Sequence, residues 1–257
     1  MNETNHSATG QGHPGNYPYL YAPADGYVFV VTYGRSGSTL MQKLLNSIDG
    51  YCIRGENNNS LMPLCRSILN VDTEQNFTLR RNALKNDAGQ RKSFLRDILE
   101  TPDDPWFGAE LVDPEDYARS LLDAFVRSIL HPPPGTRVLG FKDIHFYKDA
   151  GFFPKMMTYM LRYFPNARII FQTRDLEQVS RSGWWKAMPQ KKVIETLSAA
   201  DTLYRNFAAS NDRCLLFDYS SFAKGPEGVQ PIFDFLGETA NEEKVQAVLQ
   251  KKLAHLQ

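Results

Sequence analysis

The chain has 257 residues, of which 42% are hydrophobic. A chain of this length can bury one large α/β core and lies near the upper limit for one domain, so we expect a single domain over 21–257. Its 29 basic and 29 acidic side chains cancel. This balance argues against nucleic acid or an anionic membrane as a partner, and any positive field must be local.

Two features bear on where the protein resides. Residues 1–20 are rich in Asn, Gly, His, Pro and Ser and contain no apolar run, so we expect a flexible tail and no signal peptide. No stretch is apolar over the length of a membrane span. The three cysteines, Cys52, Cys65 and Cys214, lack metal-site spacing, which predicts reduced thiols, no zinc site and a cytoplasmic location.

The most informative segment is 27–40, where an apolar run passes into a loop of small residues and then into a helical pattern. The run 27–32 predicts a buried parallel strand, two glycines allow a tight turn, and 38–48 carries apolar residues at helical spacing. The amides of such a loop and the N-terminus of the helix can converge on an anion. Ser38 stands where an ordinary P-loop has its lysine, and the cation is Arg35 instead.

A second apolar strand ends in Arg174 and Asp175, and Ser182 follows eight residues after the arginine. A guanidinium offers paired donors to a phosphate, and a hydroxyl completes the shell, so this block also predicts a phosphate site. A surface ion pair of Arg174 with Asp175 or Glu177 is the alternative. Ser180 is the alternative to Ser182.

Apolar runs alternate with helical patterns along the chain. Strands separated by helices predict an α/β fold with a central parallel sheet and helices on both faces. The segment 57–132 contains no convincing strand and is predicted to be a helical insertion that forms a lid or acceptor wall over the strand ends. The expected strands are 27–32, 51–54, 137–141, 167–173 and 213–217.

The two phosphate blocks together resemble those of sulfotransferases that use 3′-phosphoadenosine 5′-phosphosulfate (PAPS). The loop Gly34-Arg-Ser-Gly-Ser-Thr-Leu40 resembles the one that holds the 5′-phosphosulfate, and the resemblance extends over roughly 27–237. It implies a three-layer P-loop-like fold, PAPS as co-substrate and no metal. It also implies that Arg35 neutralises charge on the bridging oxygen. The donor-binding residues that it implies are Arg35, Ser36, Gly37, Ser38, Thr39, Arg174 and Ser182.

Glu56 is the expected catalytic base, because it follows the strand 51–54 and a carboxylate there faces the crevice where ligands bind. The Gly55-Glu56 step also resembles the Gly-Glu of protein-tyrosine sulfotransferases, whose glutamate is the base. The alternative is that Glu56 caps a helix that starts near Asn58.

A further polar cluster, Gly140-Phe-Lys-Asp-Ile-His145, ends the strand at 137–141. Lys142 could stabilise negative charge on the moving group, which makes it a third catalytic candidate beside Glu56 and Arg35. Cytosolic sulfotransferases have Lys-x-His, whereas this chain has one residue more. Strand alternation would turn His145 to the opposite face, so the choice between Glu56 and His145 as base stays open, with Glu56 preferred.

The predicted function is transfer of a sulfuryl group from PAPS to an acceptor hydroxyl, with carbohydrate the favoured acceptor. A nucleotide-dependent kinase is one alternative, disfavoured by the missing loop lysine and by the lack of an acidic strand end for Mg²⁺. A non-catalytic nucleotide-binding protein is the other. Two motifs stay outside the predicted site: Trp184 and Trp185, which are expected to pack in the core, and the basic end 251–257, for which late donor contacts and a solvated helix end are equal alternatives.

Overall fold

The computed structural model describes residues 14–253, with side chains over 15–250, so the basic end 251–257 lies outside the described side chains. Its centre is one sheet of five strands in the order β2-β3-β1-β4-β5. All neighbouring strands pair in parallel, which confirms the predicted class. The strands are β1 (Gly26–Val31), β2 (Tyr51–Arg54), β3 (Val138–Asp143), β4 (Arg168–Thr173) and β5 (Cys214–Asp218).

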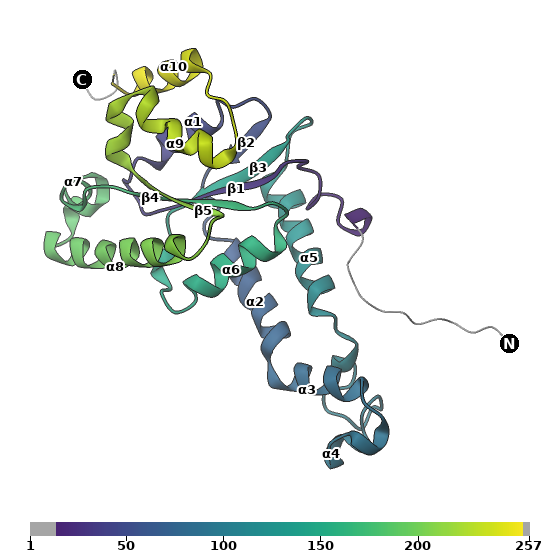
Figure 1. Ribbon diagram of the computed structural model, residues 1–257. Coiled ribbons are helices and arrows are strands. Elements are labelled where there is room, and N and C mark those ends of the chain that lie inside the picture. Colours follow the sequence, from purple (N-terminus) through teal and green to yellow (C-terminus); the bar gives the residue numbers. More distant parts are fainter. Residues whose placement is uncertain (1–13, 254–257) are drawn as a thin grey trace.

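Helices cover both faces of the sheet and produce the three-layer fold (Figure 1). Successive side chains of a strand point to opposite faces, so Tyr27, Phe29 and Val31 enter one hydrophobic cluster and Val28 and Val30 the other. The second cluster includes residues of α1 (Ser38–Leu45), α9 (Pro226–Leu236) and α10 (Glu242–Leu253). The first includes residues of α2 (Leu61–Thr73), α5 (Pro114–Phe125), α6 (Phe153–Tyr163), α7 (Leu176–Ser180) and α8 (Gln190–Ala209).

Local sequence signals explain where several helices begin and end. Asp113 precedes α5 and accepts a hydrogen bond from the Glu115 amide at 2.8 Å, while Pro114 occupies the first turn, where no amide is needed. Gly237 follows α9 with φ 71°, a left-handed conformation that glycine adopts without strain. Among the described residues, no helix is long and apolar enough to cross a membrane.

Residues 17–20, near the N-terminus, pack against α5. Tyr17 and Leu20 are buried, and the Tyr17 hydroxyl donates to Asp116 at 2.5 Å. The amides of Tyr19 and Leu20 both donate to one carboxylate oxygen of Asp123. Residues 17–20, predicted to belong to a flexible tail, are therefore anchored on the helix by two buried side chains and three hydrogen bonds.

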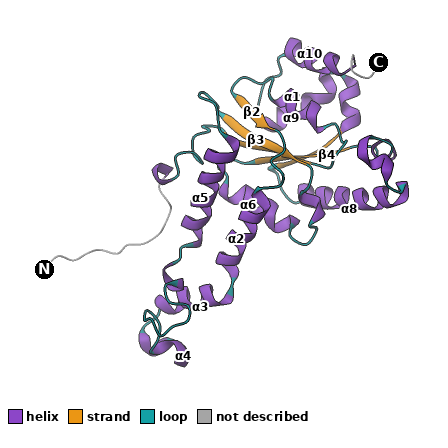
Figure 2. Cartoon of the chain, turned by 180° about the vertical axis from the view of Figure 1, so that it is seen from behind, coloured by secondary structure: helices purple, strands orange, loops and turns teal. Residues whose placement is uncertain are grey.

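The segment between β2 and β3 is helical, and its outer part projects away from the sheet in both views (Figures 1 and 2). Helices α2 and α5 lie side by side and connect this outer part to the rest of the domain (Figures 1 and 2). The projecting tip contains α3 (Gln75–Leu84) and α4 (Ser93–Arg96) and has a small core of its own, formed by Ala83, Leu95 and Leu99.

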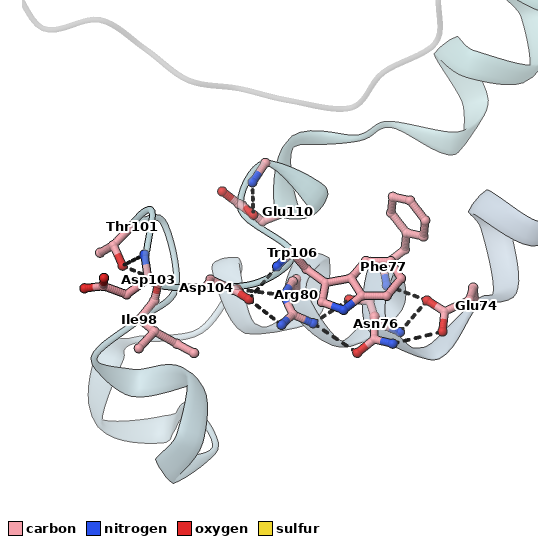
Figure 3. Close-up of polar contacts among 11 residues, drawn as sticks. Glu74, Asn76, Phe77, Arg80, Ile98, Thr101, Asp103, Asp104, Trp106 and Glu110 are labelled. Carbon is pink, nitrogen blue, oxygen red and sulfur yellow. Dashed lines mark hydrogen bonds and ion pairs between the residues drawn. The ribbon is translucent and has the colours of Figure 1, made fainter.

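An ion pair ties the two sides of this tip together (Figure 3). The guanidinium of Arg80 donates to both carboxylate oxygens of Asp104, at 2.7 and 2.5 Å, and both residues are buried. Asp104 also accepts from the Trp106 amide at 2.9 Å. Breaking one partner of such a buried pair leaves the other charge uncompensated, so we expect the tip to depend on this contact.

We predict that Asp104→Asn weakens the tip, because one oxygen of the pair becomes an amide and a buried guanidinium loses its charged partner. The free energy of opening of α3 should fall by about 1.5–3 kcal/mol, measured by amide hydrogen exchange. Glu177→Gln is the control, since its pair with Arg181 is exposed and should contribute less than about 1 kcal/mol. Equal exchange rates in α3 of wild type and Asp104→Asn would contradict the prediction.

Candidate functional site

The loop between β1 and α1 crosses the carboxyl end of the central strand and has the backbone geometry of an anion cradle. Gly37 precedes α1 with φ 89°, and a Cβ atom on it would lie 2.1 Å from the Tyr219 ring. Arg35 is also left-handed, with φ 69°. A non-glycine residue in this region is strained by about 1–3 kcal/mol, a cost that concentrates at functional sites. At the start of α1 the Leu40 amide donates to the Gly37 carbonyl at 2.9 Å, so the amides of Ser38 and Thr39 are the ones left without an acceptor in the helix.

A cavity of about 450 Å³ opens over this loop. It lies at the carboxyl ends of β1, β3 and β4, where a ligand is expected in an open parallel sheet. Most predicted site residues line it. Its lining from the loop and α1 comprises Gly34, Arg35, Gly37, Ser38, Thr39, Leu40 and Lys43, and the rest comprises Glu56, Lys142, Ile144, Arg174, Ser182, Trp184, Tyr219 and Val248.

The structure brings Arg35, Arg174 and Ser182 together from segments about 140 residues apart. Arg35 Nε donates to Ser182 Oγ at 2.9 Å, and Arg174 Nη1 donates to the carbonyl of Arg35 at 3.1 Å. The Arg174 guanidinium also lies 4.3 Å from the centre of the Tyr219 ring. Both phosphate blocks therefore contribute to one positively charged wall.

No carboxylate forms an ion pair with Arg174 among the described residues. Glu177 pairs with Arg181 instead, and Asp175 accepts from the Gln178 amide at the start of α7. Burial and then the charge of Arg35 lower the pKa of Arg174, and its Nε has no hydrogen-bond partner. Two neighbouring cations with an unsatisfied donor favour the binding of an anion.

The serines of the two blocks differ in position. Ser38 and Ser182 line the cavity, whereas Ser36 is fully buried beneath the loop and its carbonyl accepts from Gln172 at 2.8 Å. The Ser36 hydroxyl is buried without a partner, so its predicted phosphate contact stays a prediction. Ser180 is buried and donates to the Glu177 carbonyl, which leaves Ser182 as the serine that faces the cavity.

Glu56 and Lys142 meet on the other side of the cavity. Lys142 Nζ donates to Glu56 Oε1 at 2.6 Å, although the residues are 86 positions apart. The lysine side chain is 10% exposed and the glutamate 36%, so the carboxylate is the more accessible of the two. Helix α2 begins at Leu61 with Ser60 before it, so Glu56 does not cap it. The pair places a proton acceptor and a cation beside the phosphate-binding loop.

Asp143 fixes the turn after β3, and this turn directs His145 away from the cavity. The buried Asp143 carboxylate accepts from the amides of His145 and Phe146, at 2.6 and 3.1 Å, and burial raises its pKa. Ile144 lines the cavity, whereas His145 does not, and its Nδ1 is buried without a partner. This geometry favours Glu56 over His145 as the group that faces a ligand.

Two aromatic residues outside the predicted site line the cavity. Trp184 lies against the loop, because a Cβ atom on Gly34 would be 2.1 Å from its Cζ2, and it remains 54% exposed. Trp185 is buried as expected, with Nε1 donating to the Gly34 carbonyl at 2.9 Å. Tyr219 follows β5. The sequence signal for Tyr219 is its position directly after a predicted parallel strand, because ligands bind at the carboxyl ends of such strands.

Three cysteines are free thiols, and within residues 15–250 no cluster of His, Cys, Asp and Glu side chains has the arrangement of a metal site. The cavity instead combines hydroxyls, loop amides, two arginines and two lysines, with one carboxylate. Such a set suits a ligand that carries several negatively charged phosphate or sulfate groups. The fold and site thus define an α/β protein of the P-loop-like class with a strand-loop-helix anion site.

A model of the sulfotransferase family matches residues 27–242, and the chain belongs to this family. No curated protein matches the sequence. The fold is similar to the sulfotransferase domain of the Synechococcus PCC 7002 olefin synthase, with a TM-score of 0.50 and 18% identity over 85% of this chain and 75% of that one. It is also similar to sulfotransferase STF9 from Mycobacterium avium, with a TM-score of 0.44 and 13% identity over 94% of this chain and 71% of that one.

A half-buried carboxyl, that of Asp201 on α8, makes stability depend on pH. Burial raises the pKa of Asp201 to about 6 from its ordinary 3.8, although the Tyr33 hydroxyl opposes the shift. That hydroxyl also accepts from the Arg174 amide at 2.9 Å. As the pH rises between these two values the unfolded chain releases the proton first, so the free energy of unfolding falls.

We predict that Asp201→Asn removes this decline. The difference in slope should be no more than about 1.4 kcal/mol per pH unit, measured by urea unfolding over the range of pH between the two pKa values. Asp97→Asn, at an exposed position, is the control and should follow the wild type. Identical slopes for wild type and Asp201→Asn would show that this carboxyl is not the cause.

Proposed function

We propose that this protein transfers a sulfuryl group from PAPS to an acceptor hydroxyl. The observation that carries the proposal is the meeting of three elements at one cavity: the loop with Arg35, the pair of Arg174 and Ser182, and the pair of Glu56 and Lys142. Family membership supports the reaction class, and PAPS dependence is the finer part of the proposal.

The residues at the cavity fit a donor with phosphate groups at both ends of its sugar. The amides at the start of α1, with Ser38 and Thr39, suit the 5′-phosphosulfate. Arg174 and Ser182 suit the 3′-phosphate, and the Arg174 Nε atom without a partner is one donor available to it. Arg35 is hydrogen-bonded to Ser182 in this structure. Because its side chain is exposed, it can turn toward the oxygen that bridges the phosphate and the sulfuryl group of the donor.

When bound, the donor supplies the sulfuryl group and a bisphosphate leaving group. Glu56 accepts the proton of the acceptor hydroxyl, whose oxygen forms the new bond to sulfur as the bond to the bridging phosphate oxygen breaks. The electron pair of that broken bond stays on the phosphate. Lys142 orients Glu56 through Oε1 and places its charge beside the developing negative charge. The reactants are held in line, as in phosphoryl transfer.

The carbohydrate acceptor stays a prediction from the sequence alone, and a cytoplasmic location is part of the proposal. The location is supported by the three free thiols. The kinase alternative lacks a loop lysine, because Ser38 occupies that position. Calorimetric titration with adenosine 3′,5′-bisphosphate and with ATP, with and without Mg²⁺, tests the donor site. Tight, metal-independent binding of the bisphosphate is expected, and preference for ATP with Mg²⁺ would overturn the proposal.

We predict that Glu56→Gln abolishes most turnover while donor binding is kept. Loss of a general base lowers kcat by about 100-fold or more. Affinity for adenosine 3′,5′-bisphosphate, measured by calorimetry, should change by less than about threefold, since its site is formed by other residues. Glu243→Gln, an exposed substitution on α10, is the control and should leave kcat unchanged. Retained turnover in Glu56→Gln would show that another group is the base.

We predict that Arg174→Gln weakens donor binding. Loss of charge-assisted hydrogen bonds worth about 1.5–3 kcal/mol corresponds to a Kd for adenosine 3′,5′-bisphosphate that is about 10- to 100-fold higher. Arg181→Gln is the matched control, because Arg181 is exposed and pairs with Glu177 outside the cavity. Equal affinities of the two variants would place the 3′-phosphate elsewhere.

A further inference from the structure

A second cavity, of about 890 Å³, lies between the turn after β3 and helix α8. Its size suits a small organic molecule. Two of its lining residues, Trp184 and Met188, are well exposed, at 54% and 39%. The lining consists of Tyr147, Lys148, Ala150, Trp184, Trp185, Met188, Thr196, Ala199, Ala200, Thr202 and Leu203.

The chemistry of this lining is apolar. Three of its side chains, Lys148, Thr196 and Thr202, carry a hydrogen-bonding group that is not on an aromatic ring, and none of the eleven is a carboxylate or an amide. The Thr202 hydroxyl already donates to the Ser198 carbonyl at 2.9 Å. A ligand rich in hydroxyls would leave many of them without partners here, whereas an alkyl or aryl group would lose only its contact with water.

The second cavity adjoins the first. Trp184 lines both, with one part of its ring system against Gly34 of the phosphate-binding loop. The turn after β3 contributes a lining residue to each cavity: Ile144 lines the first cavity, and Tyr147 lines the second. The two cavities therefore share Trp184 as a common wall, and a molecule in the second cavity lies beside the phosphate-binding loop.

We propose that the second cavity holds the body of the acceptor, and that the acceptor is an alcohol or phenol with an apolar alkyl or aryl group. The inference rests on the proposed function, because it places the acceptor hydroxyl at Glu56. It narrows the acceptor class away from a free sugar, whose hydroxyl groups the lining does not match. Each methylene buried in the cavity should tighten binding about fourfold.

Calorimetry on the full chain tests the proposal, with 4-hexylphenol and phenol as probes and the protein saturated with adenosine 3′,5′-bisphosphate. We expect 4-hexylphenol to bind at least about 100-fold more tightly than phenol, because its chain is buried. Ala199→Phe, which fills the cavity from an exposed position on α8, should weaken 4-hexylphenol at least about tenfold. Thr202→Phe, one turn further along the helix, should act in the same way.

Ala209→Phe is the matched control, since it makes the same substitution at an exposed position of α8 outside the cavity. It should leave 4-hexylphenol binding unchanged. All three variants should keep the wild-type affinity for adenosine 3′,5′-bisphosphate, which also verifies that they are folded. The proposal is overturned if 4-hexylphenol binds no better than phenol or glucose, or if both cavity variants bind it like wild type.

The two proposals fail in different ways. Loss of the donor site would appear as no binding of adenosine 3′,5′-bisphosphate to the wild type, whatever the alkylphenol does. A wrong acceptor class would appear as normal bisphosphate binding without a preference for the hexyl chain. Transfer of labelled sulfate from PAPS then provides the kinetic readout: for wild type kcat/KM should rise with chain length, and for Ala199→Phe it should not.

Discussion

The site depends on one electrostatic constraint: two arginines lie beside each other, and among the described residues no carboxylate forms an ion pair with either. Arg35 and Arg174 follow different strands; Arg35 donates to Ser182, and Arg174 donates to the Arg35 carbonyl. Burial, together with the charge of Arg35, lowers the pKa of Arg174. Folding places both there because β1 and β4 are neighbours in the sheet. The repulsion is relieved when an anion binds, which couples donor binding to the stability of this edge.

The charges around the cavity are distributed asymmetrically, with the two arginines on one side and the pair of Glu56 and Lys142 on the other. Acidic charge faces the cavity through Glu56, on the side opposite Arg174, and Lys142 holds it there at 2.6 Å. The groups proposed to bind the donor and the group proposed to accept the proton are thus separated, as transfer between two substrates requires. Trp184 stands between this cavity and the apolar one beside it, so a single side chain contacts both proposed binding regions.

The parallel sheet could be predicted because each strand is a short apolar run bounded by turn residues, as at β1 and β4. The place of the two predicted phosphate blocks in the fold could be predicted because both depend on local order: a strand, a tight turn and the start of a helix. Their binding of phosphate stays a prediction. What the sequence did not indicate is that Tyr17 and Leu20 find partners on a helix about 100 residues later. Contacts over such separations leave no periodic signal in the sequence.

The sequence by itself determined the class of fold, the strand-loop-helix unit around Arg35, and Glu56 as a candidate base, because these follow from residue types at short spacing. Only the tertiary structure decided that Lys142 is the partner of Glu56, that Ser182 and not Ser180 faces the cavity, and that Trp184 lines both cavities. The physical reason is that these relations depend on which strands are neighbours and how turns direct side chains, and both are set by packing across the whole sheet.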